Sequence, residues 1–447
     1  MIVKARQRPR KLRKCLLACA ILAAFLVILS VYCPQGWVTN KEAHASAQMT
    51  CRPRRSICFL KTHKCASSSV QNLLMRYGDR NNLSFVLPPR NNYLGHPKHF
   101  NRRMALDYDA RRYDMLVHHS RFHEREMRAV LAPDPVFVTI VREPASLFES
   151  IFSYYALERK FGRPLNVLYR SIIDSDVSST VDLGVRFFRG KIGTNQMSFD
   201  LGFEPDQFLN ASAVEGFVRY IDTTFDLVMV AERMNESLVL LRHLLCWDWD
   251  DVVMFKMNER NKKYKKRLKP EELEGLRKLN AVDSELYRYF TRRLDERIAA
   301  FGRDRMAAEV EKLVNNTNKW YYRCVEDVTP VRRNQRKKFW VNPKVMRLKG
   351  REGNPEECRG LLTEELSFTD HLRRKQQRVT MTNVTTSAVN TESRSATVRR
   401  DPNIIPKTEL YGIPDLRKLG VGLLWKVTKT PFTRLRPAED SRAVAII

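Results

Sequence analysis

With 447 residues, the chain is long enough for one large domain or two small ones, and its 43% hydrophobic residues allow a buried core, which excludes a wholly disordered polypeptide. Its formal net charge of +29 indicates a surface that attracts anions, whether nonspecific polyanions or one specific ligand. Seven of these charges lie in residues 1–14, and basic runs such as 261–267 are typical of a solvated surface. The nine cysteines form no CxxC or Cys/His pattern, so we expect no metal site.

The N-terminus has the pattern of a membrane anchor. A basic tail over residues 1–14 precedes an uncharged, largely apolar run over 15–33. As a helix this run would rise about 28 Å, enough to cross a hydrocarbon core of roughly 30 Å. Basic flanks stay in the cytosol, so a stem over 34–55 and everything after it are expected in the lumen, where nucleic acid is not an expected partner. The alternative is a signal peptide cut near Ala45 or Ala47, but the apolar run is long for a signal.

Sequons and cysteines fit a lumenal chain. Six cysteines follow the apolar run, and some should pair in an oxidising compartment. We predict one disulfide, between Cys324 and Cys358. The candidate N-glycosylation sites are Asn82, Asn210, Asn235, Asn315 and Asn383.

Compact apolar runs alternate with helical patterns beyond the stem. The expected strands are Ile57–Leu60, Met115–His118, Val136–Val141, Phe225–Ala231 and Val252–Phe255. The helices expected between them are Ser68–Tyr77, His123–Val130, Ala145–Arg159, Asp206–Tyr220 and Ser237–Cys246. Runs of this kind are typical of strands buried on both faces of a parallel sheet. The alternation therefore predicts an α/β fold of three layers around a central parallel sheet.

Past Pro270 the pattern becomes helical and then fades. The further helices expected are Glu271–Leu279, Ser284–Phe301 and Asp304–Leu313. We expect residues 367–412 to be of low complexity and disordered, above all Gln376–Arg400, which is rich in Thr, Ser, Asn and Arg. The last segment, 413–447, contains an apolar stretch that could dock on the body or on a membrane surface but is too short to span a bilayer.

A polar and basic loop follows the first expected strand. A lysine, the hydroxyls and the N-terminus of a helix beginning near Ser68 together suit a phosphate. The loop lacks glycine and does not match the GxxxxGK[ST] pattern of nucleoside triphosphatases. An ordinary helix capped by a serine is the alternative interpretation. The loop consists of Lys61, Thr62, His63, Lys64, Cys65, Ala66, Ser67, Ser68 and Ser69.

A second polar transition follows the strand expected at Val136–Val141. Arg142 lies at the strand end, Pro144 suits the first turn of a helix, and Ser150 lies roughly two turns farther on. The guanidinium and the hydroxyl could therefore close on one phosphate. The alternative is an arginine that pairs with Glu143. Two such sites predict a ligand with two separate phosphate-like ends.

Taken together, the two motifs resemble those of sulfotransferases that use 3′-phosphoadenosine 5′-phosphosulfate (PAPS). The stretches FLKTHKxASSxV and REPxxLFESxFxYY narrow the resemblance to the galactose 3-O-sulfotransferases of the Golgi, the group that includes galactosylceramide sulfotransferase. Further similarity lies at His119–His123, Phe199–Phe203, Glu236–Trp247 and Asp251–Asn258. One departure is Cys65, where the family usually has threonine. The loss of that hydroxyl leaves the backbone N–H in place.

The resemblance implies a P-loop-like sulfotransferase fold over residues 56–366, in a type II membrane protein of the Golgi. It implies transfer of sulfate from PAPS to the 3-hydroxyl of galactose, with the acceptor open between a glycolipid and a glycoprotein glycan. The expected donor-binding residues are Lys61 to Ser69, Arg142, Ser150 and Arg260. Lys64 would also stabilise charge on the leaving oxygen, which makes it a catalytic candidate.

Histidines near the donor loop are the candidate general bases. We expect His119 to be the base, since an unperturbed imidazole pKa near 6.5 suits proton transfer in the Golgi lumen, and His63 and His123 are alternatives. Arg121 and Phe199 are expected to face the sugar.

Two other classes of function compete with this hypothesis. A P-loop kinase would need a glycine-rich loop and an acidic magnesium ligand, and neither is evident in the sequence. A catalytically inactive glycan-binding protein would lack the base or the donor contacts, yet His119, Lys64, Arg142 and Ser150 are all present.

Overall fold

The computed structural model describes residues 51–378, apart from 108–111, 163, 166, 168–191 and 332–343. These described residues belong to one compact unit of the chain. The expected membrane anchor at 15–33, most of the stem, Asn383 and the segment 413–447 lie outside them. Among the helices that the structure describes, none is both long and apolar enough to cross a membrane.

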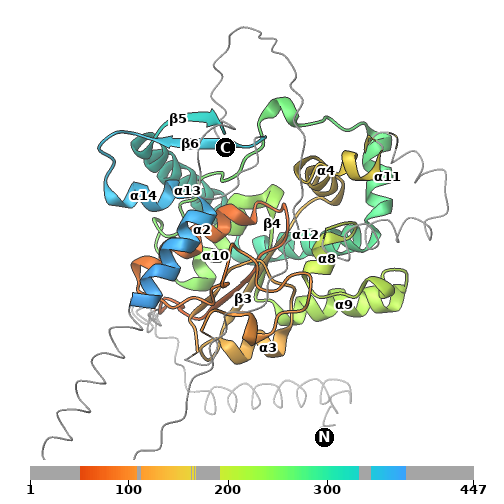
Figure 1. Ribbon diagram of the computed structural model, residues 1–447, viewed down its shortest axis with the longest axis horizontal. Helices are drawn as coiled ribbons and strands as arrows, with labels where there is room; N and C mark the ends of the chain where they lie inside the picture. The colour runs from red at the N-terminus through yellow and green to blue at the C-terminus, as the bar shows by residue number, and fades with distance from the viewer. Residues whose placement is uncertain are drawn as a thin grey trace, which may run out of the picture. The chain divides into compact units, whose positions relative to one another are not determined.

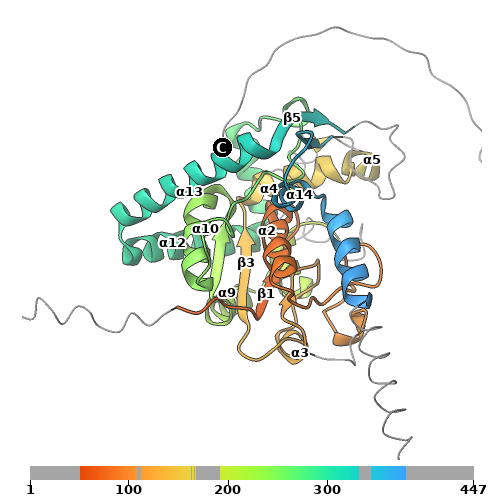
Figure 2. The same cartoon turned by 90° about the vertical axis from the view of Figure 1, so that its left-hand side faces the viewer.

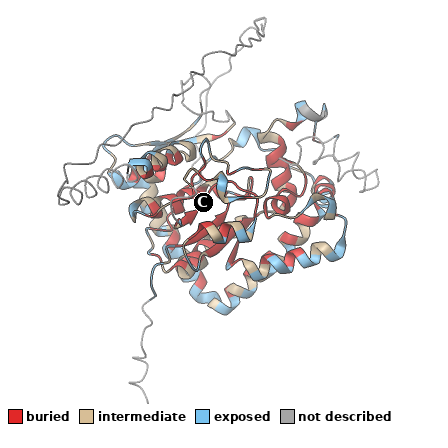
Figure 3. Cartoon of the chain, turned by 60° about the horizontal axis from the view of Figure 1, so that its bottom comes forward, coloured by how far each residue is buried: buried red, intermediate tan, exposed pale blue. Residues whose placement is uncertain are grey.

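A parallel sheet forms the centre of this unit. Its strands are β1 (Ile57–Leu60), β2 (Met115–Leu116), β3 (Val136–Val141) and β4 (Leu227–Val230), in the spatial order β2-β1-β3-β4. Every residue of the four strands is buried, as expected for apolar runs with neither face in water. Figure 3 shows buried residues gathered at the centre and exposed ones on the outer faces of the helices. The prediction of a central parallel sheet is confirmed.

The prediction of a fifth strand at Val252–Phe255 is wrong. This segment is buried but makes no strand. Val253 and Phe255 pack in a second, smaller apolar cluster with the sulfur atoms of a disulfide. The Val253 carbonyl accepts a hydrogen bond from the Arg76 guanidinium. The apolar run therefore identified burial correctly, but the segment pairs with no described strand, and the Val253 carbonyl bonds a side chain instead.

Helices surround the sheet (Figures 1 and 2). The first five described helices are α2 (Ser67–Arg80), α3 (Glu124–Val130), α4 (Pro144–Tyr154), α5 (Leu157–Phe161) and α8 (Gln196–Asp200). They are followed by α9 (Ala211–Thr224), α10 (Met234–Leu245), α11 (Pro270–Leu279), α12 (Ala281–Phe301) and α13 (Arg303–Cys324). Both α10 and α12 contact β4.

Local sequence explains where several helices begin and end. Pro144 occupies the first turn of α4, and the Glu143 carboxylate accepts hydrogen bonds from the Ala145 and Ser146 N–H groups. The helix expected over Ala145–Arg159 is interrupted near Ala156, whose φ of 51° is left-handed. Gly302, with a φ of 96°, separates α12 from α13.

Beyond α13 the chain forms a small covering region. Strands β5 (Val325–Pro330) and β6 (Met346–Gly350) pair antiparallel, and α14 (Glu356–Leu362) follows. The predicted disulfide Cys324–Cys358 is confirmed, and it joins the end of α13 to α14. A second disulfide, Cys51–Cys246, which the sequence did not suggest, ties the start of the described chain to the end of α10.

A helix over residues 365–378 follows α14. Phe368, Thr369 and Leu372 are buried on one side of it, and the Gln376 side chain bonds the backbone N–H and carbonyl of Phe85 at 2.6 and 3.2 Å. The prediction of disorder from residue 367 is therefore wrong for residues 367–378. Their composition is polar, but the few apolar residues recur at helical spacing and pack on the body.

Replacing both Cys324 and Cys358 with serine should lower the free energy of unfolding by about 3–4 kcal/mol. The disulfide spans 34 residues of sequence, and opening it restores chain entropy to the unfolded state. Urea unfolding of the purified protein, followed by intrinsic fluorescence, measures the difference. An unchanged midpoint and slope would show that the bridge contributes nothing to stability.

Candidate active site

The two phosphate motifs meet at the carboxyl ends of β1 and β3. These strands pair in parallel from Ile57↔Val136 to Leu60↔Thr139, so the loops that follow them leave the same edge of the sheet. Arg142 Nη1 donates a hydrogen bond of 2.8 Å to the carbonyl of Lys64. The loop at residues 61–69, hereafter the donor loop, is thus joined directly to the second motif.

Hydroxyl groups fix the shape of the donor loop. Thr62 Oγ1 donates to the Ile140 carbonyl at 2.7 Å, and Ser67 Oγ donates to the Thr62 carbonyl at 2.5 Å. Ser69 Oγ accepts from the Met257 N–H at 2.8 Å. The Ser67 and Ser69 hydroxyls thus stabilise the shape of the loop, and the Ser68 hydroxyl bonds Lys61. Contact of these serines with a phosphate stays a prediction.

The start of α2 has the geometry of an anion site. Lys64 and Ala66 both have a φ of 59°, and Ala66 is the N-cap of α2 without a side-chain hydrogen bond to the helix. This left-handed turn lets the chain wrap around the end of the helix, where backbone N–H groups and the helix dipole favour negative charge.

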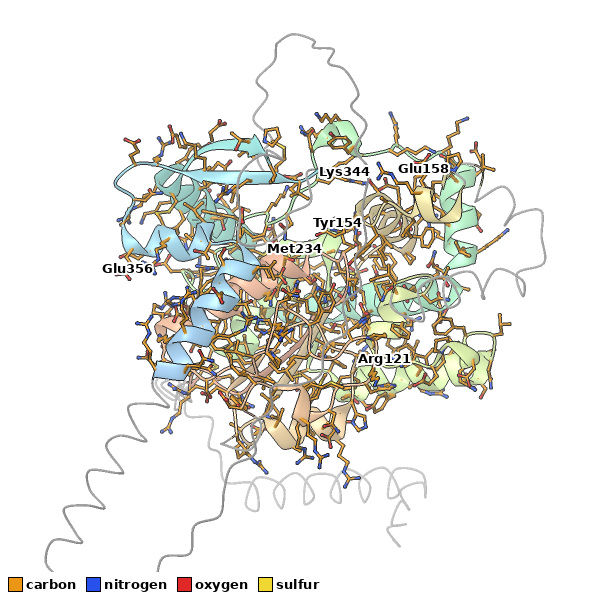
Figure 4. The ribbon with its side chains drawn as sticks, viewed as in Figure 1. Arg121, Tyr154, Glu158, Met234, Lys344 and Glu356 are labelled. Carbon is orange, nitrogen blue, oxygen red and sulfur yellow. A yellow bond between two sulfur atoms is a disulfide. The ribbon has the colours of Figure 1, made fainter. Side chains whose placement is uncertain are left out.

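Four cations gather around this point. Lys61 is only 1% exposed, and Lys64, Arg142 and Arg260 are half-buried. Burial, together with repulsion from Arg142, Lys61 and Arg260, lowers the pKa of Lys64 to about 7. Lys64 Nζ also lies 3.7 Å from the centre of the Tyr154 ring (Tyr154 is labelled in Figure 4). The cluster has an excess of positive charge and should bind an anion strongly.

Carboxylates partly offset this charge. Arg260 donates to both oxygens of Glu149, at 2.8 and 2.5 Å. Glu149 immediately precedes the buried Ser150 in the chain. Glu365 lies 3.0 Å from Lys61 Nζ through each of its two oxygens. Sequence analysis missed Glu365, because nothing in its local sequence indicates a contact with a loop some 300 residues earlier.

Asp200 and His63 form a buried pair beside the loop. Asp200 Oδ2 accepts from the backbone N–H and from Nδ1 of His63, both at 2.8 Å, and Oδ1 accepts from Gln196 Nε2 at 2.8 Å and His96 Nε2 at 3.1 Å. Burial alone would raise the pKa of Asp200, but the bonds from His63 and His96 hold it well below its usual value. Because an ionised Asp200 accepts from Nδ1, Nε2 of His63 is the basic nitrogen, and it lies 3.3 Å from the Tyr93 hydroxyl.

His119 stacks on this pair. Its ring centre is 4.3 Å from that of His63 and 4.9 Å from that of Tyr93. Its Nδ1 lies 3.1 Å from the Lys61 carbonyl and its Nε2 lies 3.2 Å from Lys61 Nζ. Burial and the nearby Lys61 charge lower the pKa of His119 well below the usual value, so its ring is neutral. The third candidate, His123, is exposed and caps the N-terminus of α3.

Within the part of the chain that the structure describes, His63, His96 and Asp200 form a group that could hold a cation, because one ligand atom from each lies within 4.8 Å of the others. The four N–H donors around Asp200 satisfy this carboxylate without a metal. The arrangement is therefore that of a buried carboxylate hydrogen-bonded to a histidine.

Comparison with known proteins agrees with these motifs. The model of the galactose-3-O-sulfotransferase family matches residues 1–376. The chain is 32% identical over 351 residues to galactosylceramide sulfotransferase of Bos taurus, which covers 73% of this chain and 82% of that protein. The chain belongs to the galactose-3-O-sulfotransferase family. It is therefore a sulfotransferase.

Two other relatives support the same assignment. Galactose-3-O-sulfotransferase 3 of Mus musculus is 31% identical over 345 residues, covering 72% of this chain and 78% of that protein. Galactose-3-O-sulfotransferase 2 of Homo sapiens is 36% identical over 284 residues, covering 62% of this chain and 69% of that protein.

In this sulfotransferase, Arg121 supports the chain beside the site. The Arg121 guanidinium lies 4.1 Å from the Phe199 ring and donates to the carbonyls of Phe199 and Phe203 at 3.1 and 2.9 Å. It also forms an ion pair of 3.0 Å with Glu204, and Arg121 is buried (labelled in Figure 4). Contact of Arg121 and Phe199 with a sugar stays a prediction.

The candidate glycosylation sites differ in exposure. Asn82, Asn210 and Asn315 are exposed, and Asn235 is half-buried in the first turn of α10. Asn210 also caps α9 through a hydrogen bond of 3.1 Å to the Ala213 N–H.

Asp283 holds α8, the helix that presents Asp200. Its carboxylate accepts from the N–H groups of Met197 and Ser198 and from the Ser198 hydroxyl, at 3.0, 2.8 and 2.6 Å. In the opposite direction, the Asn195 side chain, just before α8, accepts hydrogen bonds from the Val282 and Asp283 N–H groups at the start of α12. Asp283 is fully buried, and burial raises its pKa to about 6.

Asp283→Asn should change how stability depends on pH between about 4 and 6. The folded carboxyl keeps its proton up to about pH 6, whereas the unfolded one loses it near 3.9, so the wild type should lose roughly 3 kcal/mol across this window as pH rises. The asparagine variant lacks this titration. Urea unfolding of both proteins at several pH values measures the difference, and parallel curves would contradict the raised pKa.

Proposed function

We propose that this protein transfers sulfate from PAPS to the 3-hydroxyl of a galactose residue on a glycolipid or a glycoprotein glycan. Its relatives are named for sulfation of galactosylceramide or of galactose at position 3. The observation that carries the proposal is the bond from Arg142 to the Lys64 carbonyl, which joins the two phosphate motifs expected for a donor with two anionic ends.

The residues present fit such a donor. Lys61, Lys64 and Ser68 lie around the start of α2 and would hold the 5′ phosphosulfate end. Arg142 and Ser150 would hold the 3′-phosphate, and Arg260, held in an ion pair with Glu149, lies nearby. The donor supplies the activated sulfuryl group. The cations hold it and stabilise negative charge on the phosphate side as the sulfuryl group leaves.

The proposed general base is His63. Asp200 holds its Nδ1 and leaves Nε2 as the acceptor for the proton of the sugar hydroxyl, the same division of labour as in other Asp–His pairs. His119, the base expected from the sequence, has Lys61 Nζ at its Nε2. We propose that His119 positions Lys61 by accepting from it. The ammonium group of Lys61 then lies beside Ser68 at the start of α2.

We also propose that residues 15–33 anchor the protein in the Golgi membrane, with the body in the lumen. The apolar run after a basic tail, the exposed sequons and the two disulfides support this location. Protease protection in intact microsomes tests it, and digestion of the body without detergent would contradict it.

Purified full-length protein should transfer radiolabelled sulfate from PAPS to galactosylceramide, lactose or N-acetyllactosamine, with the label at position 3 of galactose. Arg142→Ala should abolish transfer by removing a donor contact. Binding of adenosine 3′,5′-bisphosphate without transfer would support a glycan-binding protein that keeps the donor site. Binding of neither donor nor product would contradict the proposed function.

Asp200→Asn and His63→Ala should each lower kcat by about 10²–10⁴, because the base loses its orienting partner or is removed. Binding of adenosine 3′,5′-bisphosphate serves as the control that each variant is folded. A near-normal kcat in both variants, with a total loss in His119→Ala, would identify His119 as the base.

Affinity for adenosine 3′,5′-bisphosphate should fall as pH rises from 7 to 9. Lys64 has a pKa of about 7 in the donor-free protein, so above that pH the lysine must take up a proton before it can pair with the ligand, at a cost of up to about tenfold in Kd per pH unit. Lys64→Arg stays charged throughout and should show a flatter curve. Calorimetric titration measures both, and equal slopes would contradict the lowered pKa.

A further inference from the structure

The carboxylate of Glu365 contacts the donor loop near both of its ends, at Lys61 and at Ser68. Its two oxygens each lie 3.0 Å from Lys61 Nζ, and Oε2 accepts from Ser68 Oγ at 2.8 Å. Oε1 accepts from Asn92 Nδ2 at 2.6 Å. Only 11% of the Glu365 side chain is exposed. An ammonium, a hydroxyl and an amide therefore converge on one anionic group at the start of α2.

This contact is held in place from both sides. Before Glu365, the Asn72 side chain of α2 donates to the carbonyls of Gly360 and Thr363 at 3.0 and 3.2 Å, and the Cys324–Cys358 disulfide fixes α14. After it, Thr369 is fully buried with its hydroxyl 3.0 Å from His118 Nε2. The fold thus delivers a carboxylate to this point specifically.

A carboxylate presents the charge and the oxygen acceptors that a sulfate or phosphate group presents. The partners of Glu365 are the residues suited to such a group, and the surrounding cations leave a net positive charge when Glu365 is not counted. Burial alone would raise the pKa of Glu365, but Lys61, Asn92 and Ser68 lower it to about 2, so the carboxylate is ionised at any physiological pH.

We propose that Glu365 is an internal anion that occupies the subsite of the donor's 5′ anionic group until the donor displaces it. The inference rests on the proposed function and adds a residue to the donor site. While Glu365 is in place, it neutralises Lys61 and keeps Lys61 and Ser68 oriented toward the subsite. The donor must compete with it, so the apparent affinity is reduced by the fraction of protein in which Glu365 has moved away.

Glu365→Gln should therefore bind adenosine 3′,5′-bisphosphate more tightly than the wild type. If Glu365 leaves the subsite free in a tenth of the molecules or fewer, the variant's Kd should fall about tenfold or more. Isothermal titration of the full-length protein in detergent measures the Kd. Glu364→Gln is the matched control, because Glu364 is the adjacent residue and pairs with Arg347 at 3.0 Å instead of with the donor loop. It should bind like the wild type.

Adenosine 3′-monophosphate shows whether the change in affinity arises at the 5′ subsite. Because this nucleotide lacks the 5′ anion, it should bind the wild type and Glu365→Gln equally. Glu365→Asp, which shortens the side chain by one methylene, should also tighten binding of the bisphosphate. It replaces the glutamine variant in the test if that variant is unstable. Equal or weaker binding of the bisphosphate by the folded Glu365 variants would overturn the proposal but leave the donor site intact. Binding of neither nucleotide by any protein, wild type included, would overturn it together with the proposed function.

Discussion

Repulsion between cations at the carboxyl ends of β1 and β3 is the constraint on which the rest of this site depends. Lys61 and Lys64 come from one loop, Arg142 from the end of β3 and Arg260 from a distant segment, and their mutual repulsion contributes to the low pKa of Lys64. Buried charge of one sign is costly unless it is paired. Carboxylates from elsewhere in the chain therefore converge here, Glu149 on Arg260 and Glu365 on Lys61.

The same site contains a second polar network, centred on the buried Asp200 carboxylate. Asp200 accepts hydrogen bonds from four donor groups. Helix α8, which presents it, is itself held by the buried Asp283. Arg121 secures the segment after α8 through backbone carbonyls. A buried polar network is stable only when each member finds its partners, so these residues act together to place His63 beside the donor loop.

The sequence predicted the parts of the structure that depend on neighbouring residues. The bounds of β1 and β3, the donor loop between β1 and α2, and the start of α4 at Pro144 follow from apolar runs that end at polar residues. Parallel pairing then brings Arg142 to Lys64, as the two motifs suggested. The Cys324–Cys358 bridge was predicted as well.

Contacts between distant segments could not be predicted in this way. Glu365 reaches Lys61 and Asp200 reaches His63 only because of how the chain folds. Asp200 lies in Phe199–Phe203, a stretch that resembles the family, but nothing in that stretch indicates His63 as its partner, and no local pattern marks Glu365. The Val252–Phe255 run has the composition of a strand, yet Val253 and Phe255 pack against residues of α13 and α14, while Val252 packs in the main core. Composition indicates that a segment is buried, whereas its hydrogen-bond partners are set by tertiary structure.

The position of Lys64 also predicts an unusual chemical reactivity for this side chain. An ordinary lysine with a pKa near 10.4 is almost wholly protonated at neutral pH and is a poor nucleophile. With a pKa of about 7, a large fraction of Lys64 carries a free amine, and the side chain is only half-buried. Amine-directed electrophiles should therefore acylate Lys64 faster than the many surface lysines, so a covalent inhibitor could be attached to the donor loop at this residue.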